Sequence, residues 1–214
     1  MGTVLQGLQE AIESLADIRL DLDVATFMID DSVRQSIQGC IPELPEQFFI
    51  KEKEGDMEMA LYLSSDILDE LQRNNPLHCL TLHNLESFSI ALEGVSHFVF
   101  TTYRAHLGRP VSPLELEIQA EVDKFVHSLI LMTQQGEPAP KTARLLQKTF
   151  FEKAEIRESV APKERERYRV ATQAARDYCR SLFQKHRQDK NFDRLKRDAR
   201  AYYHKGLAEK LRAA

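Results

Sequence analysis

Two acid–histidine pairs in the middle of the chain have the residue types and spacing of metal ligands. Glu93 and His97 are four residues apart, and Asp123 and His127 repeat that spacing. In an α-helix this spacing places both members of a pair on one side, where they can share a ligand. Carboxylates and imidazoles bind zinc and iron. The two pairs together form a candidate metal site, and zinc or iron is the ion that they would bind, although no cofactor is required by the sequence.

The alternative interpretation is that both pairs are solvated and only support their helices. The first pair lies roughly 140° from the apolar side of its helix, and the second pair roughly 160°. Both pairs are therefore expected to face solvent unless helices from the C-terminal part of the chain cover them. If the site does bind metal, Glu117 or Glu121 is the nearest additional carboxylate.

A row of arginines is the second feature that could carry a function. On a helix near residues 163–187 these arginines fall within about 60° of arc, beside the apolar side. Arginines with neighbouring aromatic residues bind acidic protein surfaces, phosphates and stacked bases. The row consists of Arg165, Arg169, Arg176, Arg180 and Arg187. The next helical stretch adds Lys196, Arg197, Arg200, His204, Lys205 and Lys210.

The distribution of charge supports an acidic partner for this row. Residues 151–214 contain 18 Lys and Arg against 10 Asp and Glu, whereas residues 1–150 contain 11 against 23. A basic region of this kind suits an acidic protein surface, including the acidic part of the same chain. Nucleic acid is the alternative partner, and a simple solvated face is the third interpretation. The isoelectric point of about 6.0 is unlike that of a dedicated nucleic-acid binder.

The sequence carries no motif that specifies a reaction. It contains no P-loop, dinucleotide fingerprint, nucleophile elbow, His-Glu-x-x-His or paired Cys-x-x-Cys. We therefore expect a non-enzymatic interaction or regulatory protein. A nucleic-acid-binding protein and a metal-dependent helical enzyme are the alternatives. Three widely spaced cysteines favour reduced thiols and a cytoplasmic location, and no apolar run reaches the ~20 residues of a membrane span.

The elements that must position these residues are mainly helices. The chain has only 8 Gly and 8 Pro in 214 residues, which favours helices over a many-turned β fold. Strict alternation of apolar and polar residues predicts one β-hairpin near residues 47–63. Helices are predicted over 82–107 and from 113 to just before Gly136. The short connection between them makes them antiparallel neighbours.

The predicted fold class is mainly α, an antiparallel helical bundle with a small β-hairpin. An acidic region, residues 1–136, contains the hairpin and the central helical pair. After a linker at Pro138 and Pro140 comes a basic helical region, residues 141–214, expected to pack on the first as one domain. Residues 20–46 are ambiguous. Further helices are predicted near 3–17, 65–74, 141–157, 163–187 and 190–212.

Overall fold

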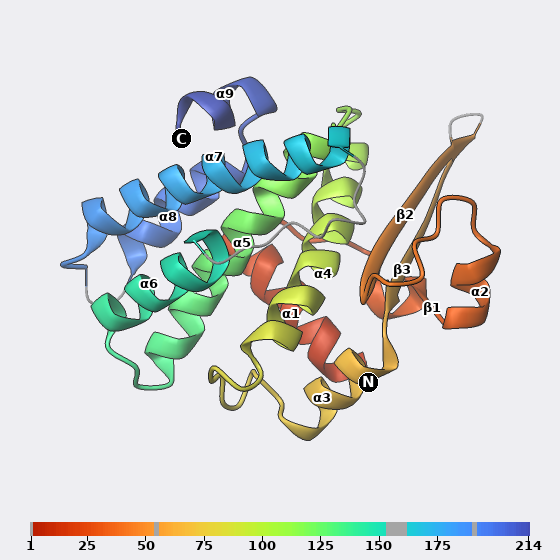
Figure 1. The fold of residues 1–214 in the computed structure, drawn as a ribbon. Helices are drawn as coiled ribbons and strands as arrows, with labels where there is room; N and C mark the ends of the chain where they lie inside the picture. The colour runs from red at the N-terminus through yellow and green to blue at the C-terminus, as the bar shows by residue number, and fades with distance from the viewer. Residues whose placement is uncertain (1, 54–55, 153–161, 190–191) are drawn as a thin grey trace.

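The computed structural model describes residues 2–53, 56–152, 162–189 and 192–214. Helices predominate, and a small three-stranded sheet lies along one side of the molecule (Figure 1). The predicted class, mainly α with a small β-hairpin, is confirmed.

The sheet is built around the predicted hairpin. Strands β2 (Glu46–Lys53) and β3 (Asp56–Leu63) are antiparallel, with Phe48 opposite Leu61. The sequence did not identify strand β1 (Met28–Ile29), which pairs in parallel with β3 and gives the order β1-β3-β2. Two residues carry too short a pattern to predict a strand, so β1 owes its conformation to its pairing with β3.

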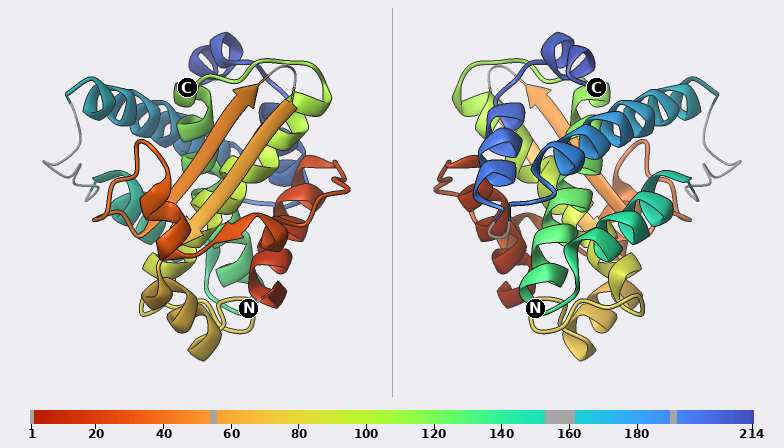
Figure 2. Two further views of the ribbon diagram at one scale, coloured as in Figure 1. Left: turned by 90° about the vertical axis from the view of Figure 1, so that its right-hand side faces the viewer. Right: turned by 90° about the vertical axis from the view of Figure 1, so that its left-hand side faces the viewer.

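Both faces of the sheet are covered near the end of β3. Helix α4 (Leu85–His106) packs behind β2 and β3, as the left view of Figure 2 shows. On the opposite side, the Arg34 guanidinium of helix α2 (Asp31–Ser36) lies 4.1 Å from the Tyr62 ring centre. Consequently three consecutive residues, Leu61, Tyr62 and Leu63, are all buried, and the alternation of exposure is lost there.

The central helical pair matches the sequence prediction closely. Helix α5 (Pro113–Gln134) begins after Ser112, whose hydroxyl accepts a hydrogen bond from the Glu115 amide. Helix α4 ends before Gly108, which has a φ of 62°, a conformation that glycine adopts without strain. Ser96 contacts Asp123 and Arg104 contacts Glu115, so residue numbers rise along one helix as they fall along the other. The two helices are therefore antiparallel neighbours, as predicted.

The remaining helices surround this pair (Figure 1). Helices α1 and α3 pack against α4, whereas α6 and α7 pack against α5. The hydrophobic core runs through all of them, from Leu8 of α1 to Leu182 of α7. A π-helical turn follows α6, and residues 153–157 of the predicted 141–157 helix lie outside the described residues. The bounds are α1 (Gly2–Ala16), α3 (Ser65–Arg73), α6 (Ala139–Gln147) and α7 (Pro162–His186), with a short 3-10 helix, Val24–Phe27, after α1.

The prediction of one helix over 190–212 is wrong. The chain forms two helices, α8 (Asp193–Tyr203) and α9 (Leu207–Arg212), which are separated at His204–Gly206. Glycine costs about 1 kcal/mol in a helix interior, so Gly206 is a natural position for the break. The change of direction turns Lys210 into the interior.

Helix α8 is fastened to the end of α1, although the two are far apart in sequence. Arg200 donates to the Leu15 carbonyl at 2.9 Å, and a His204 ring nitrogen lies 2.8 Å from the Ala16 carbonyl. The carbonyls at a helix end have no partner within their own helix. Arg200 of α8 and the adjoining His204 therefore supply hydrogen-bond partners to the last carbonyls of α1.

Candidate metal centre

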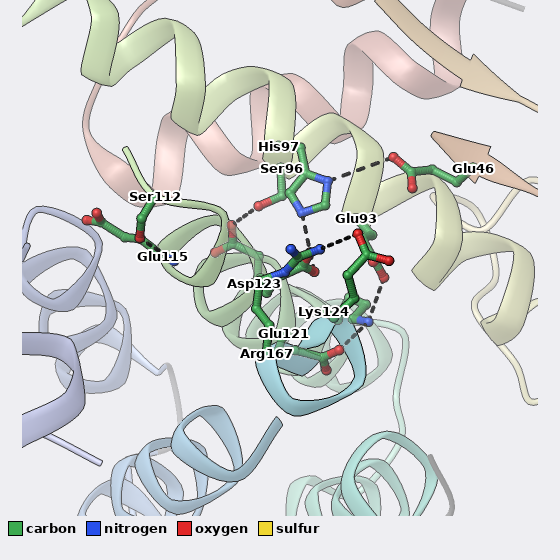
Figure 3. Close-up of polar contacts among 12 residues, drawn as sticks. Glu46, Glu93, Ser96, His97, Ser112, Glu115, Glu121, Asp123, Lys124 and Arg167 are labelled. Atoms are coloured by element: carbon green, nitrogen blue, oxygen red, sulfur yellow. Dashed lines mark hydrogen bonds and ion pairs between the residues drawn. The ribbon is translucent and has the colours of Figure 1, made fainter. Parts of the chain in front are cut away.

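A cluster of charged side chains lies between α4 and α5. Glu93 and His97 are one turn apart on α4, and Glu117 and Glu121 are one turn apart on α5. Strand β2 contributes a carboxylate from one side, and helix α7 contributes a guanidinium from another (Figure 3). We call the following set the buried cluster: Glu46, Glu93, His97, Glu117, Glu121, Lys124 and Arg167.

The His97 ring lies between two carboxylates without a hydrogen bond to either. Its Nδ1 is 3.8 Å from Glu46 Oε1, and its Nε2 is 3.9 Å from Glu117 Oε2. Both distances exceed the hydrogen-bond range. His97 is 8% exposed, and its Nε2 has no hydrogen-bond partner among the described residues. The imidazole is thus a buried ligand group directed into a set of carboxylates.

Three of these side chains have the spacing that a single ion requires. Glu93, His97 and Glu117 each offer one ligand atom, and these atoms lie within 4.8 Å of one another. Ligands about 2.0–2.2 Å from one ion lie roughly 3–4 Å apart, so small side-chain rotations would bring all three onto a common ion. The trio is the candidate metal centre.

Two permanent cations accompany the carboxylates. Lys124 Nζ lies 2.7 Å from Glu93 Oε2 and 2.8 Å from Glu121 Oε1, and so joins α4 to α5 (Figure 3). Arg167 approaches Glu117 more loosely, with 3.6 Å between nitrogen and oxygen. Four glutamates therefore face two permanent positive charges, Lys124 and Arg167, which leaves a formal excess of two negative charges when His97 is neutral.

The pKa values of the groups in the buried cluster reflect this excess of negative charge. Burial lowers the pKa of His97, but Glu46 and Glu117 outweigh burial and raise it to about 9. Burial raises the pKa of Glu117 to about 7 and also raises the pKa values of Glu46 and Glu121. Only Glu93 differs: burial acts to raise its pKa, but the neighbouring ammonium and imidazole lower it. The cluster thus holds protons more strongly than isolated side chains would.

A glycine of α4 lies against side chains from the sheet at this cluster. A Cβ atom at Gly94 would lie 2.7 Å from Leu61 Cδ1 and 3.0 Å from Glu46 Oε1. Real Cβ atoms essentially never come within 3.0 Å of another heavy atom. Gly94, between Glu93 and His97 on α4, therefore leaves the space that the ends of the Leu61 and Glu46 side chains occupy.

The predicted quartet divides into two parts. Glu93 and His97 belong to the buried cluster, but Asp123 accepts hydrogen bonds from Ser96 at 2.6 Å and from Gln119 at 2.8 Å. Asp123 faces α4 beside Ser96, the residue before His97. Its side chain nevertheless lies about 160° around α5 from Glu121, so it cannot join the same cluster.

Both pairs were expected to face solvent unless C-terminal helices covered them, and the C-terminal helix α7 does cover α5. His97 and His127 are each 8% exposed, and Asp123 is 2% exposed. Burial raises the pKa of Asp123 to about 6 and lowers that of His127 to about 4. Helix α7 packs along α5 and supplies Arg167, so the side of α5 that the sequence assigned to solvent is an internal interface.

A second buried polar network begins at Asp123. Its hydrogen-bond partner Gln119 also accepts a hydrogen bond from the Lys210 ammonium of α9. Lys210 is completely buried, with its ammonium 4.3 Å from the Phe100 ring centre and 5.2 Å from that of Tyr202. Burial lowers its pKa to about 7. The sequence placed Lys210 on a basic surface, which the break at Gly206 makes impossible.

The arginine row is only partly available for a partner. Arg169 forms two hydrogen bonds with Glu166, at 2.7 and 2.9 Å, and Arg176 lies 3.3 Å from Asp177. Arg165 is half-buried. Arg180 and Arg187 are exposed, and the part of the chain that the structure describes offers them no ion pair. The free positive charge thus lies toward the end of α7.

Sequence reasoning did not identify three members of the buried cluster, Glu46, Lys124 and Arg167. Lys124 follows Glu121 by three residues, and this helical ion-pair spacing could have indicated it. Glu46 and Arg167 come from elements whose packing against α4 and α5 no local pattern specifies. Glu117 and Glu121, named from the sequence as the nearest additional carboxylates, lie in the buried cluster, but Glu46 lies as close to His97 as Glu117 does.

The chain matches no protein-family model, no curated protein and no solved structure. Among the described helices, none is both long enough and apolar enough to cross a membrane.

Proposed function

We propose that this protein binds one divalent cation through Glu93, His97 and Glu117. The proposal is carried by His97, a buried imidazole between two carboxylates that it does not hydrogen-bond. Zinc, iron and manganese accept mixed imidazole and carboxylate ligands. Formal charge supports the idea, because a divalent cation that displaces the proton of His97 neutralises the two negative charges by which the four carboxylates exceed Lys124 and Arg167.

The chemistry available at such a site is activation of water. Three protein ligands leave a coordination position open, which is typical of catalytic metal sites rather than structural ones. Glu46 lies beside His97 and would be the carboxylate placed to accept a proton there. The side chains of Glu93 and Arg167 are 26% and 27% exposed, so the edge of the cluster contacts solvent. We therefore place the protein with metal-dependent helical enzymes.

Metal binding by matched histidine variants tests the proposal. Chelated wild-type protein dialysed against zinc, manganese or iron(II) should retain one ion per chain. His97→Ala should reduce the affinity at least tenfold, because it removes the only nitrogen ligand of the trio. His127→Ala should bind as wild type does, since this equally buried histidine lies outside the buried cluster. Elemental analysis after dialysis gives the stoichiometry, and circular dichroism checks that both variants fold.

Equal loss of metal in the two variants would indicate a general effect on packing rather than a ligand role for His97. A wild-type protein that retains none of the three metals would end the proposal.

A second candidate function follows from the exposed end of α7. We propose that Arg180 and Arg187 engage an acidic protein surface, because both are exposed and lack intramolecular ion pairs among the described residues. Polyglutamate, used as the probe, should bind weakly, and added salt should weaken binding further. The double variant Arg180→Glu/Arg187→Glu should lose most of this binding in an anisotropy assay.

Arg169→Glu is the control, because Glu166 already holds that guanidinium. If the control and the double variant weaken binding equally, polyglutamate binding does not depend specifically on Arg180 and Arg187. Tighter binding of a single-stranded oligonucleotide than of polyglutamate would instead favour nucleic acid.

A further inference from the structure

We infer that Lys124 occupies the position of a second cation, so that the buried cluster is a two-cation site in which one cation belongs to the chain. The inference rests on the proposed function in that it concerns the same cluster. It goes further by assigning a cation site, between Glu93 and Glu121, that the ammonium of Lys124 fills.

The contacts of Lys124 are those of a bridging ion. Its Nζ lies 2.7 Å from a carboxylate oxygen of α4 and 2.8 Å from one of α5, and only 11% of the side chain is exposed. Sites with two metal ions in helical bundles use carboxylates from facing helices in the same way. An ammonium provides one positive charge and three donors, which suits two carboxylates and leaves one donor over.

Glu93 connects the two positions. One of its oxygens accepts the Lys124 hydrogen bond, and Glu93 is also a member of the Glu93–His97–Glu117 trio. A carboxylate shared by two cations is the usual bridge between neighbouring ions. On the far side, Glu121 Oε2 is buried without a hydrogen-bond partner among the described residues, so this carboxylate has an unused acceptor. His97, nine-tenths buried, directs its unpartnered Nε2 into the same cluster.

Removal of the ammonium would leave two carboxylates facing each other in a poorly solvated space. Each unpaired buried charge is costly, so the cluster would take up another cation. A transition-metal ion binds carboxylate oxygen at about 2.0–2.2 Å, which is shorter than the lysine contacts, so each side chain must move inward by roughly 0.6 Å. Rotation about side-chain bonds provides that movement. The ligand class is therefore a divalent ion that accepts oxygen ligands, and manganese(II) is a suitable probe.

The test compares Lys124→Met with Lys124→Arg, using manganese(II) alone. Wild type and Lys124→Arg, which keeps the positive charge, should bind one ion per chain at saturation. Lys124→Met should bind two, and the paired ions should broaden the manganese resonance spectrum through their magnetic coupling. Lys124→Met/Glu121→Gln should return to one, because a ligand and its charge are removed together.

The outcomes separate this inference from the proposed function. One ion in both wild type and Lys124→Met overturns the inference and leaves the function standing. No ion in wild type and one in Lys124→Met overturns the function and supports the inference. No ion in either protein overturns both.

The inference can also be tested if Lys124→Met fails to fold. If Lys124→Met is unfolded without metal, manganese should restore its helical circular dichroism, because an ion that binds only the folded state stabilises it. Lys124→Gln, which keeps a hydrogen-bond donor without the charge, should respond in the same way. Failure of manganese to restore either variant overturns the inference.

Discussion

Replacement of Arg104 by methionine is expected to lower the free energy of unfolding by about 3–5 kcal/mol. Arg104 of α4 and Glu115 of α5 form an ion pair 2.9 Å long, and their side chains are only 7% and 4% exposed. Methionine preserves most of the volume but leaves the Glu115 carboxylate buried without its partner. The pair lies at the two helix ends that Gly108 connects, so its loss loosens the central hairpin.

The double variant Arg104→Met/Glu115→Met tests whether the lost stability comes from the unpaired Glu115 charge or from the lost packing of the Arg104 side chain. Removing both charges should recover most of the lost stability, because no uncompensated charge remains. Lys141→Met breaks the exposed Lys141–Glu137 pair and should cost less than about 1 kcal/mol. Urea denaturation of the four proteins gives the comparison. A double variant as unstable as the single one would show that the buried pair is not the source of the effect.

Lys210 should make the stability of the protein rise with pH across the neutral to alkaline range. Its pKa is about 7 in the folded protein, against an ordinary value of 10.5, because burial disfavours the ammonium. Between these values the unfolded chain binds more protons than the folded one, so stability rises with pH and is lost again as pH falls toward 7. The slope for one proton reaches about 1.4 kcal/mol per pH unit.

Lys210→Met should remove this slope. Asp123 and Glu115 of α5 favour the ammonium and Arg104 of α4 opposes it, but burial has the largest effect. Thermal unfolding from pH 7 to pH 10 measures the stability of wild type and variant at each pH. The difference between the two proteins isolates Lys210, because other groups, including His97, titrate in both and their effects largely cancel. Arg212→Met changes an exposed residue of the same helix and should leave the slope intact. A variant whose stability follows wild type across this range would contradict the assignment.

Elements with local signals were predictable from sequence. Ser112, Pro113 and Glu115 specify where α5 begins, and Gly108 and Gly136 have the positive φ angles of helix ends. The hairpin was predictable because apolar and polar residues alternate over two runs on either side of the sequence Glu-Gly-Asp at 54–56. The parallel strand β1 was not, because its pairing with Leu61 and Tyr62 is a tertiary event.

The candidate site was predictable only in part, for a geometric reason. Helical spacing correctly grouped Glu93 with His97, and neighbouring positions on α5 correctly suggested Glu117 and Glu121. Periodicity finds one apolar side per helix, but α5 is enclosed by both α4 and α7, so its polar side is also internal. Only the packed structure could bring Glu46 of β2 to the cluster.

The bonds between α1 and α8 affect the timing of folding during synthesis. The carbonyl of Leu15 and the guanidinium of Arg200 are separated by 185 positions. During synthesis the last carbonyls of α1 therefore lack these partners until residue 200 has been made. Contacts that span so much sequence form slowly and leave apolar surface uncovered in the meantime. Packing of α1 is then completed late, once α8 can lie against it.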